Sequence, residues 1–161
     1  MSTCALCGRD LDDHDRHVRF RLPGPVLHSP KQDRTPGSWL SGADATASVL
    51  MQIPGIGAFV RALLPVHLSG GYRVTYGVWV GIHPDDLQRS AAAWWAPEYA
   101  QLRLAGHLAN QIPPWGLLAS RVELGVVNPK HTPYCVASSD SHLSAILNDE
   151  WDHELVLSAL P

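Results

Sequence analysis

The alternation of apolar and polar residues is clearest in the segment YRVTYGVWVGI. Every even-numbered residue from Tyr72 to Ile82 is apolar, and alternation over this length is typical of a strand with one face in the core. We therefore predict a central antiparallel strand whose even-numbered side chains point to the interior. On the odd-numbered face, Trp79 stands between Gly77 and Gly81, which predicts a groove that a helix or a ligand fills.

The apolar run before this strand predicts a hairpin. The segments ATASVLMQI and AFVRALLPVHL are separated by PGIG, in which glycine supplies the dihedral angles of a turn. The run is long enough for a membrane-spanning helix, but Arg61, Pro54 and Pro65 lie within it. Two buried strands joined by a turn are therefore favoured, and Pro65 indicates an edge position or a bulge in the second one.

Two main helices are predicted after the central strand. The first, HPDDLQRSAAAWW, starts at Pro84, and Asp85 and Asp86 in its first turn complement the positive end of the helix dipole. The second lies in SHLSAILNDEWDHELVLSAL, with Asp140 or Ser141 as its N-cap. Its apolar residues at helical spacing are Leu143, Ile146, Leu147, Trp151 and Leu155.

Shorter apolar segments complete a sheet. VRFRL near the N-terminus and LRLAGHLANQI, LLASRVELGVV and TPYCVAS in the second half each predict a strand. Residues 23–43 are rich in Pro, Gly and Ser and predict a long loop rather than a domain boundary, because the segment before them is too short to fold alone. The pattern predicts a single α+β domain over residues 1–161, with an antiparallel sheet of about five to seven strands, two main helices and an N-terminal Cys-x-x-Cys knuckle.

Composition narrows the class of protein and its partners. The 161 residues are 45% hydrophobic and 17% charged, as in a globular domain. The net charge of −3 and the lack of a basic run with interleaved aromatics disfavour nucleic-acid binding. Three cysteines suit a reducing compartment, and the first residues, MSTCALCGRDLDD, lack the basic and apolar regions of a secretory signal. We therefore expect a cytoplasmic protein without a membrane segment.

The N-terminus holds the strongest candidate for metal binding. Cys4 and Cys7 form a C-x-x-C-G half-site of the kind that zinc knuckles use, and His14 and His17 form an H-x-x-H pair shortly after it. These residues are the predicted ligands of a structural zinc ion. A reduced cysteine pair without metal is the main competing interpretation. A thioredoxin-like redox pair is disfavoured because no strand precedes Cys4.

The segment HTPYC offers two further interpretations of its histidine and cysteine. His131 and Cys135 can complete a metal site with the N-terminal cysteines, or Cys135 can act as a nucleophile with His131 or His142 as its base. The alternative, which the apolar neighbours of Cys135 favour, is a small buried hydrophobic residue.

Two other groups of residues are candidates for a site. Asp44, His83 and His107 lie near the central strand, but no spacing pairs them, and no glycine-rich phosphate loop or catalytic serine motif is present. The chain has six tryptophans, and the neighbours Trp94 and Trp95 diverge by about 100° on a helix. Either one ring covers the sheet while the other reaches the groove at Gly77 and Gly81 or a partner, or both belong to a wide core stripe.

Three segments resemble an uncharacterised bacterial family, the domain of unknown function 2199. They are the CALCG knuckle, the YGVWVGI strand with the tryptophan-containing helix after it, and the helix start at Asp140, Ser141, His142 and Leu143. The chain departs from the family pattern in the Pro/Gly-rich insertion at residues 23–42 and at Leu143, where a helix-starting proline is typical. The resemblance implies the fold and carries no assigned activity.

The sequence therefore predicts a small cytoplasmic binding module without catalysis, its N-terminus held by structural zinc. Its partner is an unidentified protein or small molecule, and we expect the binding surface as an exposed apolar patch around Trp94 or Trp115. Two alternatives stay open. One is a hydrolase-type enzyme with His and Cys groups that the sequence does not pair, and the other is an immunity or inhibitor protein that masks a partner's surface.

Overall fold

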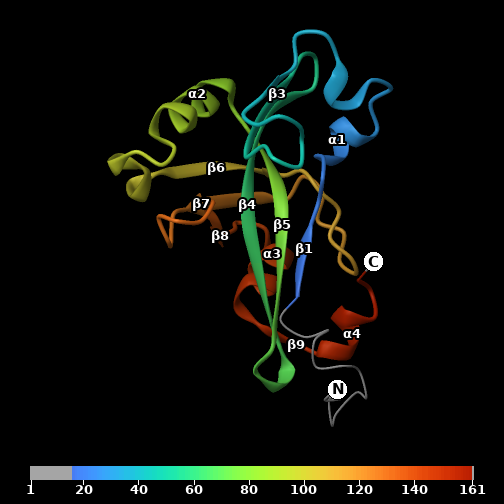
Figure 1. Cartoon of the computed structure of the whole chain (residues 1–161). Helices are drawn as coiled ribbons and strands as arrows, with labels where there is room; N and C mark the ends of the chain where they lie inside the picture. Colours follow the sequence, from blue (N-terminus) through green and yellow to red (C-terminus); the bar gives the residue numbers. More distant parts are fainter. Residues whose placement is uncertain (1–15, 161) are drawn as a thin grey trace.

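The computed structural model describes residues 16–160, which form an α+β fold (Figure 1). The strands are β1 (His17–Arg19), β2 (Trp39–Leu40), β3 (Leu50–Ile53), β4 (Gly57–Leu68), β5 (Arg73–Ile82), β6 (Arg103–Leu108), β7 (Arg121–Gly125), β8 (Tyr134–Ala137) and β9 (Glu150–Trp151). The α-helices are α1 (Gly24–Leu27), α2 (Pro84–Ala93), α3 (Ser141–Asn148) and α4 (His153–Leu157). Short 3-10 helices lie at Gln32–Arg34, Ser69–Gly71 and Pro97–Gln101.

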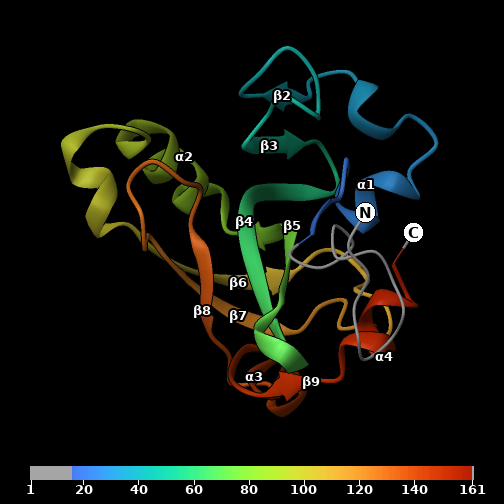
Figure 2. The ribbon, with the colours of Figure 1, turned by 60° about the horizontal axis from the view of Figure 1, so that its bottom comes forward.

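Strands β4 to β8 form a meander that closes into a barrel (Figure 2). Each strand pairs antiparallel with the next, and β8 returns to β4 in parallel, where Tyr134 lies opposite Leu63. A meander with an odd number of strands must close with a parallel pair, because its first and last strands run in the same direction. Strands β3 and β2 extend the sheet from β4, and β1 lies parallel beside β5.

The prediction for the central strand is confirmed. β5 spans Arg73–Ile82, and its even-numbered residues are buried inside the barrel. Across the antiparallel register they meet even-numbered residues of β4, such as Val80 opposite Val60 and Tyr76 opposite Leu64. Apolar side chains from β6, β7, β8, α3 and α4 fill the rest of this barrel core. Removal of this apolar surface from water is the main force that stabilises the barrel.

A second core covers the outer face of the β4–β5 hairpin. Trp79 and Phe59 lie on this face, and both are almost completely buried. The other members of the outer core are Leu22, Val26, Ala45, Met51, Ile53 and Ala109. The space that we predicted beside Trp79 is therefore filled by the chain itself, largely by α1, the residues before it and β3.

Arg61 joins this outer core with only 3% of its surface exposed. Four backbone oxygens accept hydrogen bonds from its guanidinium, those of Ser48 (2.9 Å), Phe20 (2.7 Å), Arg21 (3.4 Å) and Ala45 (3.1 Å). The guanidinium carbon lies 4.3 Å from the centre of the Trp79 ring. Burial, and to a smaller extent the positive charge of Arg19, lowers the pKa of Arg61 to about 10. One side chain thus ties the N-terminal segment and the loop before β3 to the barrel.

The predicted α+β class is confirmed. The numbers of strands and helices differ from the prediction, and some strand pairs are parallel rather than antiparallel. Among residues 16–160 there are nine strands and four α-helices, and the pairs β1–β5, β4–β8 and β4–β9 are parallel. Residues 23–43, predicted as a loop, contain α1 and β2. These short elements have little periodic pattern of their own and depend on pairing with the barrel. The predicted Cys-x-x-Cys knuckle lies outside the described residues.

The second predicted helix starts where expected and is then interrupted. Asp140 is its N-cap, and its carboxylate accepts hydrogen bonds from two backbone N–H groups. α3 ends at Asn148, and Glu150 and Trp151 pair as β9 with the end of β4 before α4 begins. The helical spacing of apolar residues continues through this break, so pairing with a distant strand overrides the local pattern.

Pro65 lies within β4 without removing a hydrogen bond from the β4–β5 ladder. The N–H groups of Arg61 and Leu63 point away from β5, because they donate to the carbonyls of Val49 and Pro133. Since alternate residues of a strand direct their N–H groups to the same side, the nitrogen of Pro65 also points away from β5. The predicted edge position is correct in this local sense, because Pro65 lies between the places where β8 and β9 join β4.

Among the described residues, the helices are all too short or too polar to cross a membrane. The apolar run that contains Arg61 forms β3 and β4 instead, as predicted.

Candidate functional site

An open groove of about 460 Å³ lies between the end of α2 and strands β2 and β3. Its walls include Trp39, Trp94 and Trp95 together with Leu40, Val49 and Ala91. None of the described residues that line it is charged. Trp39 is 43% exposed and Trp95 is 54% exposed, which is unusual for side chains that bury well in most proteins. We call this surface the tryptophan groove.

Trp39 reaches the groove because β2 is an edge strand. β2 pairs with β3, with Trp39 opposite Gln52 and Leu40 opposite Met51. Met51 points into the outer core, so Trp39, one position out of phase with it, points to the opposite face of the sheet. That face is the one on which the end of α2 lies.

Trp94 and Trp95 follow directly on α2, and the backbone sends their rings to different places. Trp94 ends the helix in an extended conformation, and Trp95 has a φ of +60°, a left-handed conformation that is rare for a large side chain. Trp94 packs against the barrel core, whereas Trp95 remains exposed. Of the two arrangements that the sequence left open, the structure has the divergent one, but Trp95 lines the tryptophan groove and not the predicted groove at Gly77 and Gly81.

The ring of Tyr99 packs against both indole rings, those of Trp94 and Trp95. Its ring centre lies 5.0 Å from that of Trp94 and 4.8 Å from that of Trp95, and the two indoles meet edge to face at 5.7 Å. The Tyr99 hydroxyl donates a hydrogen bond to the backbone oxygen of His131 at 2.6 Å. Burial raises the pKa of Tyr99 well above its usual range, so this donor stays protonated. The exposed ring of Trp95 therefore rests on a fixed aromatic support.

The groove has few polar groups. The buried indole N–H of Trp94 has no hydrogen-bond acceptor among the described residues. A buried donor in this state costs about 1–3 kcal/mol and is uncommon in native proteins. Ser41, the polar side chain of the groove, is already engaged, because its Oγ accepts the N–H groups of Val49 and Leu50.

Trp115, the alternative centre for an exposed patch, does not form one. It is half-buried against the barrel core and packs edge to face with Trp151 at 5.2 Å. The indole N–H of Trp151 likewise has no acceptor within residues 16–160. An unused N–H is therefore not unique to the groove, and it is the exposure of Trp39 and Trp95 that distinguishes the two tryptophan clusters.

Three of the four predicted zinc ligands, Cys4, Cys7 and His14, lie outside the described residues. His17 is on β1 with its side chain exposed. Within residues 16–160 no three His, Cys, Asp or Glu side chains come close enough together to hold a metal ion. The alternative metal pair, His131 and Cys135, is thus not part of a larger cluster in the described chain.

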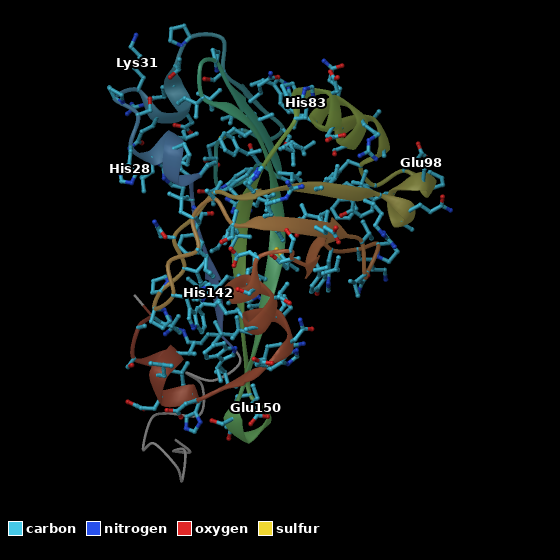
Figure 3. The ribbon with its side chains drawn as sticks, turned by 180° about the vertical axis from the view of Figure 1, so that it is seen from behind. His28, Lys31, His83, Glu98, His142 and Glu150 are labelled. Atoms are coloured by element: carbon cyan, nitrogen blue, oxygen red, sulfur yellow. The ribbon has the colours of Figure 1, made fainter. Side chains whose placement is uncertain are left out.

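Cys135 has the environment of a core residue rather than of a nucleophile. Its side chain is buried on β8 among the apolar residues of the barrel core, and burial raises the pKa of its thiol to about 12. His131 precedes β8 and its Nδ1 lies 3.1 Å from the hydroxyl of Tyr134. His142 is exposed at the start of α3, far from His83 at the start of α2 (Figure 3). A buried thiol with a raised pKa lacks the accessible thiolate that nucleophilic catalysis needs.

The remaining predicted candidates, Asp44, His83 and His107, make local hydrogen bonds or line an open groove. Asp44 accepts a hydrogen bond from the N–H of Ala47, and the Nδ1 of His83 accepts one from the N–H of Asp85 at the start of α2. His83 and His107 both line an open groove of about 400 Å³ over Gly81 and Gly106. None of its described lining residues is a carboxylate or a nucleophile, so the two histidines lack the groups that acid–base catalysis needs beside them.

The structure also pairs two residues that the sequence did not single out. The Oγ of Ser69 lies 2.6 Å from Nδ1 of His153 and accepts the backbone N–H of the same histidine at 3.1 Å. His153 is 4% exposed, so a substrate has no access to its ring. The pair anchors the turn between β4 and β5 to the start of α4. Because 84 positions separate the two residues, no local sequence motif predicts the contact.

The fold and its site define a small α+β barrel protein with an open, uncharged aromatic groove and no assembled catalytic centre within residues 16–160. The chain belongs to the DUF2199 family, described as an uncharacterised protein conserved in bacteria, whose model matches residues 3–150. This match confirms the resemblance that the sequence motifs indicated. No curated protein and no solved structure matches the chain.

Proposed function

We propose that this protein is a non-catalytic binding module that holds an extended, proline-containing segment of a partner polypeptide in the tryptophan groove. The observation that carries the proposal is the set of three indole rings on one uncharged groove, two of them about half exposed. Aromatic rings that remain open to solvent in this way are typical of recognition surfaces.

The chemistry of the groove favours a peptide over other ligands. Proline rings pack on aromatic faces, and a polyproline II segment exposes its carbonyl groups to donors such as an indole N–H. Such a segment is already extended before it binds, so it loses little conformational entropy. The flat faces of Trp39 and Trp95 supply the matching apolar surface.

Two other ligand classes fit the groove less well. A sugar needs several free polar side chains to match its hydroxyl groups, and the Ser41 hydroxyl is already engaged with the backbone. An acidic ligand, such as an anionic lipid headgroup, needs positive charge, and none of the described lining residues is charged.

The proposal is tested by NMR titration of the full chain with a synthetic decaproline peptide. The indole N–H signals of the six tryptophans, assigned by single Trp→Phe variants, report each ring separately. We expect saturable shifts at Trp39, Trp94 and Trp95 and unchanged signals at the buried Trp79. A peptide of the same length made of Ala and Ser serves as the control ligand and should cause no saturable shift.

Substitutions then separate binding at the groove from non-specific contact. Trp95→Ala and Trp39→Ala should each weaken decaproline binding by about tenfold or more, since rings of this kind dominate recognition. Leu118→Ala removes an exposed apolar side chain outside the groove and should leave binding unchanged. Shifts centred on Trp115 or Trp151 would contradict the proposal. So would signals of the groove that move with protein concentration alone, because they would identify a second copy of this chain as the occupant.

We also propose that structural zinc, held by Cys4, Cys7, His14 and His17, fixes the N-terminus of the module. The C-x-x-C-G spacing supports this, as does the exposed position of His17 on β1, which leaves its ring accessible. Metal analysis of protein purified without chelator tests it. We expect about one zinc ion per chain in the natural protein and loss of that zinc in Cys4→Ser and Cys7→Ser. Zinc-free natural protein, or variants that retain zinc, would refute the assignment.

A further inference from the structure

A cationic pocket of about 230 Å³ lies beside β1, β4 and β5, ahead of the start of β8. The residues that matter for its chemistry are Arg19, Arg61, Gly77 and Thr132, and the lining also includes Val18, Ala62, Leu63 and His17, the last of which is the zinc ligand proposed above. Its described lining contains basic and hydroxyl side chains and no carboxylate. It shares no residue with the tryptophan groove, so it is a separate site.

Gly77 is the residue that lets Arg19 lie across the wall of this pocket. β1 runs parallel to β5 (Figure 1). In this register Arg19 lies opposite Gly77. A Cβ atom at Gly77 would lie 3.2 Å from Cγ of Arg19, closer than ordinary contact, so the stem of the arginine lies directly on the glycine. The guanidinium of Arg19 has no hydrogen bond or ion pair to any residue of the described chain.

Arg61 adds a buried charge to the same pocket. A guanidinium has five N–H groups, and four hydrogen bonds to backbone oxygens account for all but one on Nη1. These acceptors are neutral, so the positive charge has no carboxylate partner within residues 16–160. The adjacent charge of Arg19 adds repulsion to the cost of burial.

Thr132 completes the donor set. The neighbouring carbonyl of Pro133 accepts the N–H of Leu63 at 2.8 Å, and this bond between the segment before β8 and β4 holds Thr132 at the pocket. The Thr132 hydroxyl has no hydrogen-bond partner in the described part of the chain. Arg19, Arg61 and Thr132 thus come from three separate segments and line one pocket, and each keeps at least one donor without an acceptor among residues 16–160.

We propose that this pocket binds a small oxyanion of the phosphate type, held by Arg19, Thr132 and the remaining N–H of Arg61. The oxygens of such an anion accept charge-assisted hydrogen bonds from guanidinium groups and relieve the repulsion between the two arginines. A cation is repelled by the same charges, and a neutral ligand leaves the buried charge without compensation. The pocket is half the volume of the tryptophan groove, which suits a single anionic group.

The test is a calorimetric titration of the full chain with inorganic phosphate at constant ionic strength. We expect saturable binding at one site. Arg19→Gln should weaken it by about tenfold or more, and Thr132→Val by a smaller factor, because a charged donor contributes more than a hydroxyl. Arg34→Gln, the same change at an exposed arginine outside the pocket, should leave the affinity unchanged. Arg61 is left intact because its side chain also holds the fold together.

Three outcomes would overturn the assignment. The first is natural protein without saturable phosphate binding, and the second is an equal loss of affinity in Arg19→Gln and Arg34→Gln. The third is binding of succinate in place of phosphate, which would assign the pocket to carboxylates. Gly77→Ala gives an independent check, since displacement of Arg19 should weaken phosphate binding while circular dichroism confirms the fold. Trp95→Ala should bind phosphate normally, so failure of the groove proposal and failure of this one are distinguishable.

Discussion

The two cores of this protein lie on opposite faces of the same β4–β5 hairpin and are built in different ways. The barrel core inside is formed by apolar side chains that alternate along regular strands. The outer core has few apolar residues and includes the buried polar groups Arg61 and Ser48, joined by hydrogen bonds. On the inner face, burial of apolar surface alone holds the segments together. On the outer face, hydrogen bonds between segments that are distant in sequence are also needed.

Asn110 shows how these polar links work in the outer core. Its side-chain oxygen accepts the backbone N–H of Trp79 at 2.8 Å, and its amide donates to the carbonyl of Leu22 at 2.9 Å. Asn110 is 3% exposed, so water does not reach the backbone N–H of Trp79 or the carbonyl of Leu22 at this place. The Asn110 side chain supplies the hydrogen bonds that these two groups would otherwise lack. Like Arg61, Asn110 satisfies the backbone of the segment before α1 in a place where no strand pairs with it.

Among the substitutions that test the difference between the two cores, the change of Arg61 should cause the largest loss in the free energy of unfolding. In Arg61→Met, four buried carbonyl oxygens lose their donor, and we expect a loss of about 4 kcal/mol in the free energy of unfolding. Urea denaturation followed by circular dichroism measures it, with Arg34→Met at an exposed site as the control. Faster amide hydrogen exchange in residues 20–27 would localise the damage to the outer core. A loss below about 1 kcal/mol would show that water replaces the guanidinium without cost.

A cavity in the barrel core should come next in size. Leu64→Ala removes a fully buried side chain, and we expect a loss of about 3 kcal/mol. Because Leu64 contributes nothing to the polar links, hydrogen exchange in residues 20–27 should rise only in step with the rest of the protein. Selective exchange in that segment would mean that the two cores are not separable. Leu118→Ala at an exposed position serves as the control.

Alkaline pH should lower the stability of the protein through Cys135 in the barrel core and raise it through Arg61 in the outer core. The pKa of Cys135 in the barrel is raised from 9.0 to about 12, so the unfolded chain loses this proton first and stability falls from about pH 9 upward. The pKa of Arg61 is lowered to about 10, so the folded chain loses this proton first and stability rises above about pH 10.

The pH effect is measured by urea denaturation at about pH 8 and about pH 10.5. We expect the natural protein to lose about 1–2 kcal/mol more than Cys135→Ala between the two conditions. Each protein is compared with itself, so the cavity left by the substitution cancels. Equal losses in both proteins would show that the thiol does not contribute.

An effect of similar, small size is expected at the indole of the outer core. Trp79→Phe removes a hydrogen bond of 3.2 Å to the carbonyl of Arg21 and weakens the contact with Arg61, and we expect a loss of about 1–2 kcal/mol. Trp151→Phe is the matched control, because its indole N–H has no acceptor in the described chain and its removal relieves an unsatisfied donor. Thermal denaturation of both variants gives the comparison. A larger loss in Trp151→Phe would contradict the assigned roles.

The sequence predicted the barrel core better than the site. The strand at Arg73–Ile82, its inward face and the start of α2 at Pro84 followed from local patterns. The divergence of Trp94 and Trp95 was one of two open alternatives, decided by the left-handed backbone of Trp95. That Trp39 would join them was not predicted, because β2 is too short to have a periodic signal and gains its position from β3.

The sequence by itself determined which face of the central strand is buried, because side-chain direction in a strand depends only on the parity of the residue. Only the tertiary structure decided that Arg61 would be buried without a carboxylate. An arginine in an apolar run indicated strands rather than a membrane helix, and this prediction was confirmed. It contained no information on the carbonyl groups around the guanidinium, because they come from loops whose positions are set by packing on the barrel rather than by their own residues.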